Sequence, residues 1–539
     1  NYQLKLKEDH NIDFLVGTTY RDRKYDLASI GLANLPSNDV EDAFISNQTV
    51  TEENMENLGV YEDVRESTLF SYFGRVNYNF LDKYFLAASL RRDGSSRFGA
   101  NNKFATFPSA SVGWLMSKDI AFQEFFPSLN YLKLRASWGQ NGNEASLGDY
   151  GFVPVINSGL GYVLGEEQLI VQGQAATTPA NADLKWEVST QTNIGFDAGF
   201  LKDKVTVAVD YFIKKTSDLL IPASILATSG AGVNDTEPPF QNIGTMDNSG
   251  WEFSVGYKTG RILKLDLGAN ISFVKNEVSS LGQSTAPIPS GFNQGLGGNT
   301  TRMEVGKPFG YFYGYQTDGI FQNTFEVEEH VNSEGVVIQP NAQPGDFRFV
   351  DFNDDGAIND ADQTDLGNPY PDFIYGFTGT LEFKGFDFNL FVQGSQGNEI
   401  VNATTRYDLR ISNLQSRRLD RWTPDNPSNT EPRVGLSDLN GNFRFSNYFV
   451  EDGSFLRLKT LQLGYTLPNQ LTKKALVQKI RFYVSAQNLL TFTKYTGLDP
   501  EIGKQNGFEN TISANLNYGI DRGLYPQAKI FIGGINLQF

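Results

Sequence analysis

The sequence predicts an all-β protein and, within that class, a transmembrane antiparallel β-barrel. Three observations support this fold class: apolar and polar residues alternate along many segments, these segments are long, and their connections alternate between short and long. Alternation with a period of two residues is the pattern of a β-strand with two different faces. Strands of soluble sheets usually contain about 5–6 residues, whereas about 9–11 tilted residues cross the apolar core of a bilayer.

The alternating segments run through most of the chain. In ILKLDLGANISF, residues 262–273, mainly apolar side chains occupy one face and mainly polar side chains the other. The same division recurs in residues 205–211, 386–393 and 460–467. We count roughly 15 or 16 such segments. Their expected centres lie near residues 5, 17, 74, 90, 112, 135, 194, 209, 253, 268, 314, 377, 390, 461, 484 and 533.

The connections favour a barrel over a soluble two-sheet sandwich, which would show the same alternation. Residues 80–84 and 201–204 are tight links. The long connections are expected at residues 142–185, 218–246, 278–307 and 398–453. Short turns on one side and long loops on the other are typical of outer-membrane barrels, as are aromatic residues near strand ends. No run of 18 apolar residues occurs, so a membrane crossing would use strands.

The composition excludes several classes of function. A formal net charge of −17 would repel phosphate groups, so no nucleic-acid partner is expected. The absence of cysteine excludes disulfides, thiolate zinc sites and a cysteine nucleophile. His10 and His330 lie far apart without a motif around either, and we interpret both as ordinary surface residues. We therefore expect no catalytic residues and no enzymatic activity.

One segment has the spacing of a calcium loop. DFNDDGAINDAD, residues 351–362, matches an EF-hand loop, although its flanks are strand-like rather than helical. Gly356 would allow the sharp turn, and Ile358 would point inward and anchor the loop. The alternative is a solvated acidic turn held by Asx hydrogen bonds. We predict a structural Ca²⁺ site with the ligands Asp351, Asn353, Asp355, the carbonyl of Ala357, Asn359 through water, and Asp362.

A small basic cluster, SRRLDRW at residues 416–422, lies in the last of the long connections. It could contact an acidic cargo, a partner protein or lipid phosphates. The alternative interpretation is a salt-bridge network within the loop itself.

Several blocks of sequence resemble a known family. They include SYFGRVNYNFLDKYFLAASLRRDGSSRFG at 71–99, LKLRASWGQNGN at 132–143, PGDFRFVDFNDDGAINDADQTDLGNPYPDFIYGF at 344–377 and YFVEDGSFLRLKTLQLGYTLP at 448–468. In this order they resemble SusC-like (RagA-like) TonB-dependent transporters of the Bacteroidota outer membrane. The blocks run through nearly the whole chain, and together they are much more specific than any one alone.

The resemblance implies an architecture. Family members have a 22-stranded barrel that encloses an N-terminal plug, and roughly 15–16 of these strands are expected here. Residues 1–539 are therefore expected to be the C-terminal portion of the barrel, without the plug and the first strands. Residues 323–370, which contain the calcium-like motif, and residues 398–453 are expected to be long extracellular loops.

The resemblance also implies a function and partners. We expect an importer of glycan or peptide oligomers that works with a SusD-like lipoprotein lid, amid outer-membrane lipids. TonB would supply energy through the N-terminal region outside this chain, and a dimer of transporter–lid pairs is one expected assembly. The alternatives are a passive porin and a surface glycan-binding adhesin, with a glycoside hydrolase a distant third. The residues that bind cargo cannot be chosen from the sequence.

Overall fold

In the computed structural model, the described residues are 1–7, 9–31, 59–145, 147–166, 168–178, 180–222, 240–282, 286–291, 299–405, 415–435, 438–472, 477–503 and 515–539. Their main element is one sheet of 15 strands, in which every hydrogen-bonded pair is antiparallel. In sheet order its strands are β1 (Tyr2–Leu6), β2 (His10–Gly31), β3 (Gly59–Phe80), β4 (Tyr84–Ser95), β5 (Phe104–Leu115), β6 (Leu129–Asn143), β9 (Glu187–Phe200), β10 (Val205–Pro222), β11 (Phe240–Thr259), β12 (Leu263–Ser280), β19 (Phe373–Phe383), β20 (Phe386–Gln396), β23 (Phe455–Thr466), β24 (Lys479–Thr493) and β26 (Ile530–Gln538).

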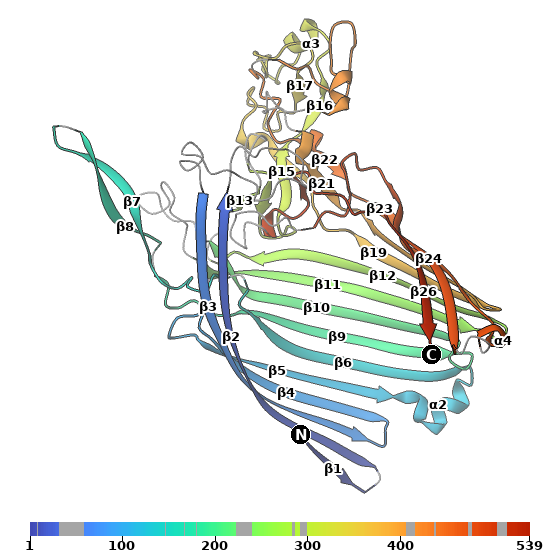
Figure 1. The fold of residues 1–539 in the computed structure, drawn as a ribbon. Helices are drawn as coiled ribbons and strands as arrows, with labels where there is room; N and C mark the ends of the chain where they lie inside the picture. Colours follow the sequence, from blue (N-terminus) through green and yellow to red (C-terminus); the bar gives the residue numbers. More distant parts are fainter. Residues whose placement is uncertain are drawn as a thin grey trace, which may run out of the picture.

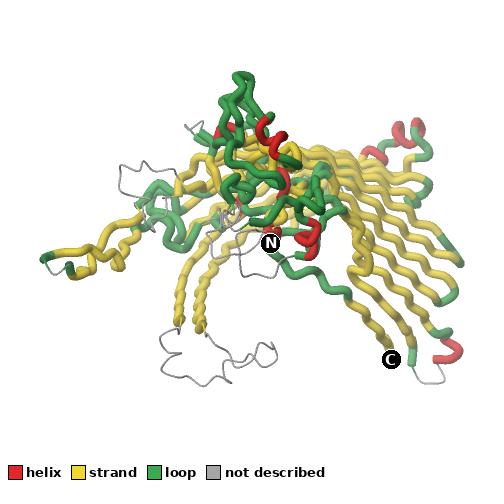
Figure 2. The backbone as a smooth tube through the Cα atoms, turned by 90° about the horizontal axis from the view of Figure 1, so that it is seen from above, coloured by secondary structure: helices red, strands yellow, loops and turns green. Residues whose placement is uncertain are grey.

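The sheet is strongly curved. Figure 1 shows its long, tilted strands side by side, and the view from above in Figure 2 shows the strands following an arc. Within the described residues, β1 and β26 are the two edges of the sheet, because each pairs with one neighbour. The predicted fold class, the antiparallel wall of a transmembrane β-barrel, is confirmed. Of the 16 expected strand centres, 15 lie in this sheet.

The two faces of the sheet differ as the alternation predicts. Along β4 the exposed and less exposed residues alternate strictly from Tyr84 to Arg92. Large apolar side chains such as Leu90 and Ile194 are 56% and 60% exposed, with no protein packed over them. In a membrane this face contacts lipid, while the polar face lies on the inside of the curve. No helix in the described part of the chain is long and apolar enough to span a bilayer.

Short turns lie at one end of the sheet. Between β19 and β20 the turn is Lys384–Gly385, where both residues have positive φ, of 47° and 90°. Two left-handed residues form the type I′ geometry that matches the twist of a hairpin. Two short helices, α2 (Ile120–Phe125) and α4 (Asn469–Thr472), lie in connections at this end (Figure 1).

Long connections lie at the opposite end and contain small elements of their own. The β6–β9 connection forms a hairpin that projects from the sheet (Figure 1). We call the described parts of the β12–β19 and β20–β23 connections the loop tower. The β6–β9 hairpin consists of β7 (Val155–Leu164) and β8 (Leu169–Thr178), and the β24–β26 connection contains β25 (Ile520–Asp521). The elements of the loop tower are β13 (Ile288–Ser290), β14 (Thr301–Met303), β15 (Tyr311–Tyr315), β16 (Thr317–Ile320), α3 (Thr324–Glu328), β17 (Phe347–Phe349), β18 (Gln363–Gly367), β21 (Glu399–Asn402) and β22 (Val450–Asp452).

The loop tower is folded around buried side chains. One apolar cluster contains Tyr315, Phe347, Phe349 and Trp422, and a second contains Phe312, Val401, Phe445 and Phe449. The two connections contribute to both clusters, so they fold together as one unit. Residues 323–370 lie wholly in this tower, as does the described part of residues 398–453, whose residues 406–414 and 436–437 lie outside the described chain.

The strand expected near residue 314 is the one wrong placement. Tyr311–Tyr315 forms β15, which pairs with β14 and β18 in the loop tower rather than with the large sheet. It alternates in sequence, but it has five residues and is buried on both faces. Burial on both faces is incompatible with a wall that has one exposed apolar face, and the flanking Gly310 and Pro308 mark a local turn-rich segment.

Candidate functional site

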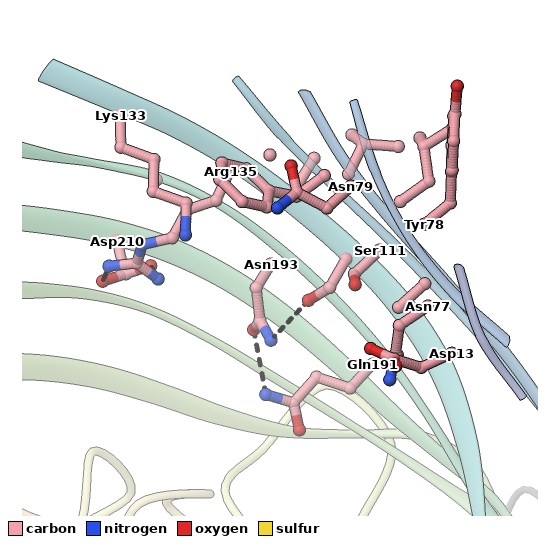
Figure 3. Close-up of a pocket in the computed structure, with 18 of the residues that line it drawn as sticks. Asp13, Asn77, Tyr78, Asn79, Ser111, Lys133, Arg135, Gln191, Asn193 and Asp210 are labelled. Atoms are coloured by element: carbon pink, nitrogen blue, oxygen red, sulfur yellow. Dashed lines mark hydrogen bonds and ion pairs between the residues drawn. The ribbon is translucent and has the colours of Figure 1, made fainter. Parts of the chain in front are cut away.

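The inner face of the sheet forms a continuous polar wall. A cavity of about 570 Å³ lies against it, and strands from β2 to β11 contribute its lining. Figure 3 shows amide, hydroxyl and charged side chains pointing into this space from neighbouring strands. Asn193 accepts a hydrogen bond from Gln191 and donates one to Ser137. Twelve of the nineteen described residues that line the cavity have side chains that can form hydrogen bonds.

Arg135 forms the central ion pairs of this wall. Its guanidinium donates to Asp197 at 3.0 and 3.1 Å and to Asp210 at 2.6 Å through two nitrogens. The three residues come from β6, β9 and β10, so the guanidinium reaches across the middle strand. It can do so because Gly195 has no side chain: a Cβ there would lie 2.3 Å from Asp210 Oδ1.

A second ion pair repeats this arrangement on the opposite part of the sheet. Arg481 on β24 donates to both oxygens of Asp387 on β20, and β23 lies between them. Gly464 on β23 leaves the space, because a Cβ there would lie 2.5 Å from both groups. Charged groups that cross a strand over a glycine tie three strands together without filling the interior.

A further buried pair anchors a long connection to the sheet. Arg457 on β23 donates to Asp499 at 2.5 Å and to Glu501 at 2.7 Å. Both carboxylates lie in the β24–β26 connection, and only 3% of the Arg457 side chain is exposed. Burial alone would raise the pKa of Asp499, but hydrogen bonds from Arg457 and two backbone amides outweigh it and hold that pKa below its ordinary value.

A second cavity, of about 550 Å³, lies on the inner face toward the long connections. We call it the Lys214 cavity. Lys214 on β10 lines its wall, and Phe309, Tyr370 and Tyr518 from two connections also line it. The rings of Tyr370 and Tyr518 are stacked, with centroids 5.7 Å apart and planes 18° apart. Burial raises the pKa of Tyr370, so its phenol stays protonated and can donate a hydrogen bond.

The six predicted calcium ligands lie together in a compact turn between β17 and β18. Asp351 accepts hydrogen bonds from the backbone amides of Asp354 and Gly356, and Asp362 accepts from those of Phe352 and Asn359. Gly356 has φ of 82°, the left-handed conformation that the sharp turn requires. Ile358 packs against the first apolar cluster of the loop tower, so its predicted inward orientation is confirmed.

The donor set contains only oxygen atoms, which suits calcium. As the loop is folded, however, the side-chain amides of Asn353 and Asn359 donate to Asp355 at 2.9 Å each. These hydrogen bonds lower the pKa of Asp355. Among the described residues, no group of three or more carboxylate or histidine side chains converges as a metal site. Calcium binding would require both asparagine side chains to turn, so the Ca²⁺ site stays a prediction.

The basic cluster forms a network inside the loop tower. Arg417 and Arg418 both pair with Glu431, at 2.6 and 2.8 Å, and Arg418 is only 6% exposed. Trp422 is buried and donates its indole N–H to Gln322 at 3.0 Å. Of the two interpretations of this segment, the internal salt-bridge network agrees with these contacts. The pairs join two segments in the middle of the β20–β23 connection that are 13 and 14 residues apart in sequence.

The two histidines lie in different regions. His10 is at the start of β2, where its Nδ1 lies 2.8 Å from the Tyr78 hydroxyl. His330 is partly buried beside Phe321 in the loop tower, so the interpretation of it as a surface residue is wrong. Burial is the main cause that lowers the pKa of His330, so its ring stays neutral near pH 7.

Sequence reasoning did not select Arg135, Asp210 or Lys214. Each occupies the polar face of an alternating segment, where charged residues are rarer than Ser, Thr and Asn. Their position on the polar face was the signal in the sequence that could have identified them. It could not show which charges would meet, because Arg135 and Asp210 are 75 residues apart in the chain.

Comparisons with known proteins agree with this architecture. The family described as TonB dependent receptor-like, beta-barrel, matches residues 1–537. TonB-dependent receptor P3 of Formosa agariphila is 35% identical over 534 residues, which are 98% of this chain and 51% of that relative. TonB-dependent receptor SusC of Bacteroides thetaiotaomicron is 32% identical over 483 residues, 88% of this chain and 44% of SusC.

Solved structures give the same result. The structure of the RagAB peptide transporter matches with a TM-score of 0.74 and 25% sequence identity, and the match covers 100% of this chain and 54% of the RagAB chain. The RagAB peptide importer in the 'open-open' state has a TM-score of 0.76 at the same identity. The chain spans about half the length of these relatives.

The wall of outward apolar and inward polar residues thus has a known counterpart over its full length. The predicted resemblance to SusC-like and RagA-like proteins is confirmed, and both named source organisms are Bacteroidota. The location of such a sheet is the outer membrane. The chain belongs to the family of TonB-dependent receptor-like β-barrels.

Proposed function

We propose that the protein containing this chain actively imports oligomeric nutrients across the outer membrane. The observation that carries the proposal is the match to SusC and to the RagAB peptide transporter along nearly the whole chain. The polar wall around Arg135 supports it, because a hydrated inner surface suits passage of polar cargo. No catalytic step is needed for this role.

The proposed orientation places the long connections and the loop tower outside the cell. In outer-membrane barrels the longer loops are extracellular and the short turns periplasmic. A SusD-like lipoprotein lid is the proposed partner above the tower, and TonB is the proposed energy source through a region outside this chain. The proposed cargo is an oligomer, either glycan or peptide.

Uptake measurements test the proposal. We would delete the gene and compare uptake of fluorescent oligosaccharides and peptides in the parent strain, the deletion strain and a strain lacking TonB. We expect uptake to fall in both mutants and to stop when the proton gradient is collapsed. Uptake that needs this protein but neither TonB nor the gradient would instead support a passive porin.

The partner is tested separately. Purification of the full-length protein in mild detergent should recover a SusD-like lipoprotein in a fixed ratio. Recovery of the protein alone, together with cell-surface glycan binding but no uptake, would contradict the importer and support an adhesin.

We also propose that residues 351–362 bind a structural Ca²⁺ ion. The oxygen-only donor set and the spacing of the loop support this, although the present hydrogen bonds would have to rearrange. Extracellular calcium modules bind with Kd on the order of 10⁻⁴–10⁻³ M. With Kd of about 10⁻⁴ M, 1 mM Ca²⁺ would stabilise the tower by about 1.4 kcal/mol.

Calorimetry checks this prediction. Chelation should lower the stability of the loop tower, and Ca²⁺ but not the same concentration of Mg²⁺ should restore it. The variant Asp355→Asn should lose the response. An identical melting profile with chelator and with Ca²⁺ would favour the solvated acidic turn.

A further inference from the structure

The Lys214 cavity has a distinct place in the fold. Its walls are the inner faces of β6, β9, β10, β11 and β12 near the ends that carry the long connections. Asn515 and Tyr518 of the β24–β26 connection line it from another side. Cargo that enters past the loop tower would meet this cavity before the Arg135 cavity, which lies farther along the same strands.

Lys214 is the one cationic residue among the described residues that line this cavity. Within the described residues, no carboxylate lies within 4 Å of the Lys214 ammonium, and Lys214 makes no side-chain hydrogen bond. Arg135, on the same wall, is by contrast paired with two carboxylates. Glu187 also lines the cavity, but its oxygens accept from Asn143 at 2.6 Å and from the amide of Leu220 at 2.9 Å. An ammonium that lines a cavity and has no carboxylate partner in the described chain can form a charge-assisted hydrogen bond with an anionic ligand.

The same cavity offers a flat aromatic surface. The stacked Tyr370 and Tyr518 rings lie among its lining residues, and neither hydroxyl has a hydrogen-bond partner within the described chain. Aromatic rings with a polar edge bind groups that are apolar on one face and hydroxylated at the rim. Apolar side chains such as Met246 and Val274 complete the surface.

The backbone of the five wall strands offers cargo no free sheet edge. Peptides commonly bind by adding a strand to a free sheet edge. The five wall strands are all interior strands, and each is hydrogen-bonded to two neighbours. Recognition here therefore rests on side chains: an ammonium, two phenols and amides such as Asn248 and Asn515. These groups suit the carboxylate and vicinal hydroxyls of a sugar acid.

We propose that the Lys214 cavity is a cargo subsite for carboxylate-bearing oligosaccharides, in which Lys214 pairs with a uronate and the Tyr370–Tyr518 pair packs on the adjoining sugar ring. This inference rests on the proposed importer function and adds to it a class of cargo. It assigns Lys214 the role of charge selection, whereas the tyrosine pair binds charged and neutral sugar rings alike.

Calorimetric titration of the full-length transporter with its lid tests the subsite. The probes are tetragalacturonate and its methyl ester, which differ in charge but share the sugar backbone. We expect tetragalacturonate to bind about 10- to 100-fold more tightly, as for a hydrogen bond to a charged group. Lys214→Gln should abolish that difference, and added salt should reduce it. Tyr518→Ala should weaken both probes about equally.

Lys215→Gln is the matched control. Lys215 is the next residue of β10 and therefore lies on the opposite face of the sheet. It should leave both affinities unchanged, and all variants should retain the lid on purification, which shows that they fold.

The inference is overturned if tetragalacturonate does not bind, if its methyl ester binds equally well, or if Lys214→Gln keeps the difference. Tighter binding of an acidic tetrapeptide would also overturn it and favour peptide cargo. These outcomes are separate from failure of the importer proposal, because lid recovery and TonB-dependent uptake are measured independently. If the transporter retains its lid and its TonB-dependent uptake but does not bind uronates, only the subsite proposal is overturned.

Discussion

The 15-stranded sheet and the loop tower use apolar residues in opposite ways. Of the eleven largest fully buried side chains in the described chain, Leu220 alone belongs to the sheet, at its long-connection end, where the smaller Val278 of β12 is also fully buried. Phe349, Phe312 and Phe449 are buried in the tower. In the sheet, by contrast, apolar residues such as Ile194 remain exposed on the outer face.

This difference reflects two solvents. In lipid, burial of apolar groups gives no separate driving force, and the paired backbone of the strands is what makes the sheet stable. In water, the tower must remove apolar area from solvent to fold, as any soluble domain does. One chain therefore contains a tower folded around apolar clusters and a wall whose large buried apolar residues, such as Phe107, Leu220 and Val278, lie where the long connections pack against it.

The largest expected effect is on the core of the tower. Phe349→Ala should destabilise the tower by about 3–5 kcal/mol, because it removes a fully buried ring and leaves a cavity. Hydrogen exchange of the full-length protein should show lost protection in the tower while the sheet stays protected.

Phe352→Ala is the control, because that ring is 54% exposed only three residues away. Its effect should be within about 0.5 kcal/mol. Simultaneous loss of protection in tower and sheet after Phe349→Ala would mean that the two regions do not fold as separate units.

A charge on the outer face should have the next largest effect. Ile194→Arg should destabilise the sheet by about 2–4 kcal/mol if it lies near the bilayer midplane, because the charge would enter lipid. Urea unfolding of the protein in lipid vesicles measures this change. Ile194→Phe, which stays apolar, should be nearly neutral. Equal stability of both variants would contradict contact between this face and lipid.

Acidification should have a smaller, local effect at the link between sheet and connection. The pKa of Asp499 is lowered in the folded state, so its charge stabilises this state above the ordinary pKa of about 3.9. That stabilisation should decrease as the pH falls below about 4 toward the lower folded-state pKa. Hydrogen exchange of residues 494–503 should increase there, and Asp499→Asn should remove the pH dependence. Unchanged exchange between pH 7 and pH 3 would contradict the assigned role of the Arg457 pair.

The strands could be predicted from sequence because their signal is local. Residues 262–273 show both faces within one segment, and β12 forms where the alternation indicates. Tyr311–Tyr315 has the same alternation, yet it pairs inside the tower. Its pairing partners and its burial on both faces decided its place, and neither was visible in the sequence. The tower itself could not be predicted, since its clusters join residues such as Phe349 and Trp422 from different connections.

The sequence by itself determined the class of the sheet, the order of its strands and the face each presents, because period-two alternation and turn residues act between near neighbours in the chain. It also determined the composition of the 351–362 loop. The tertiary structure alone decided which charges meet: Arg135 reaches Asp210 across Gly195, whereas Lys214 on the same wall meets no carboxylate of the described chain. Ion pairing depends on distances between strands, and the curvature and register of the folded sheet set those distances.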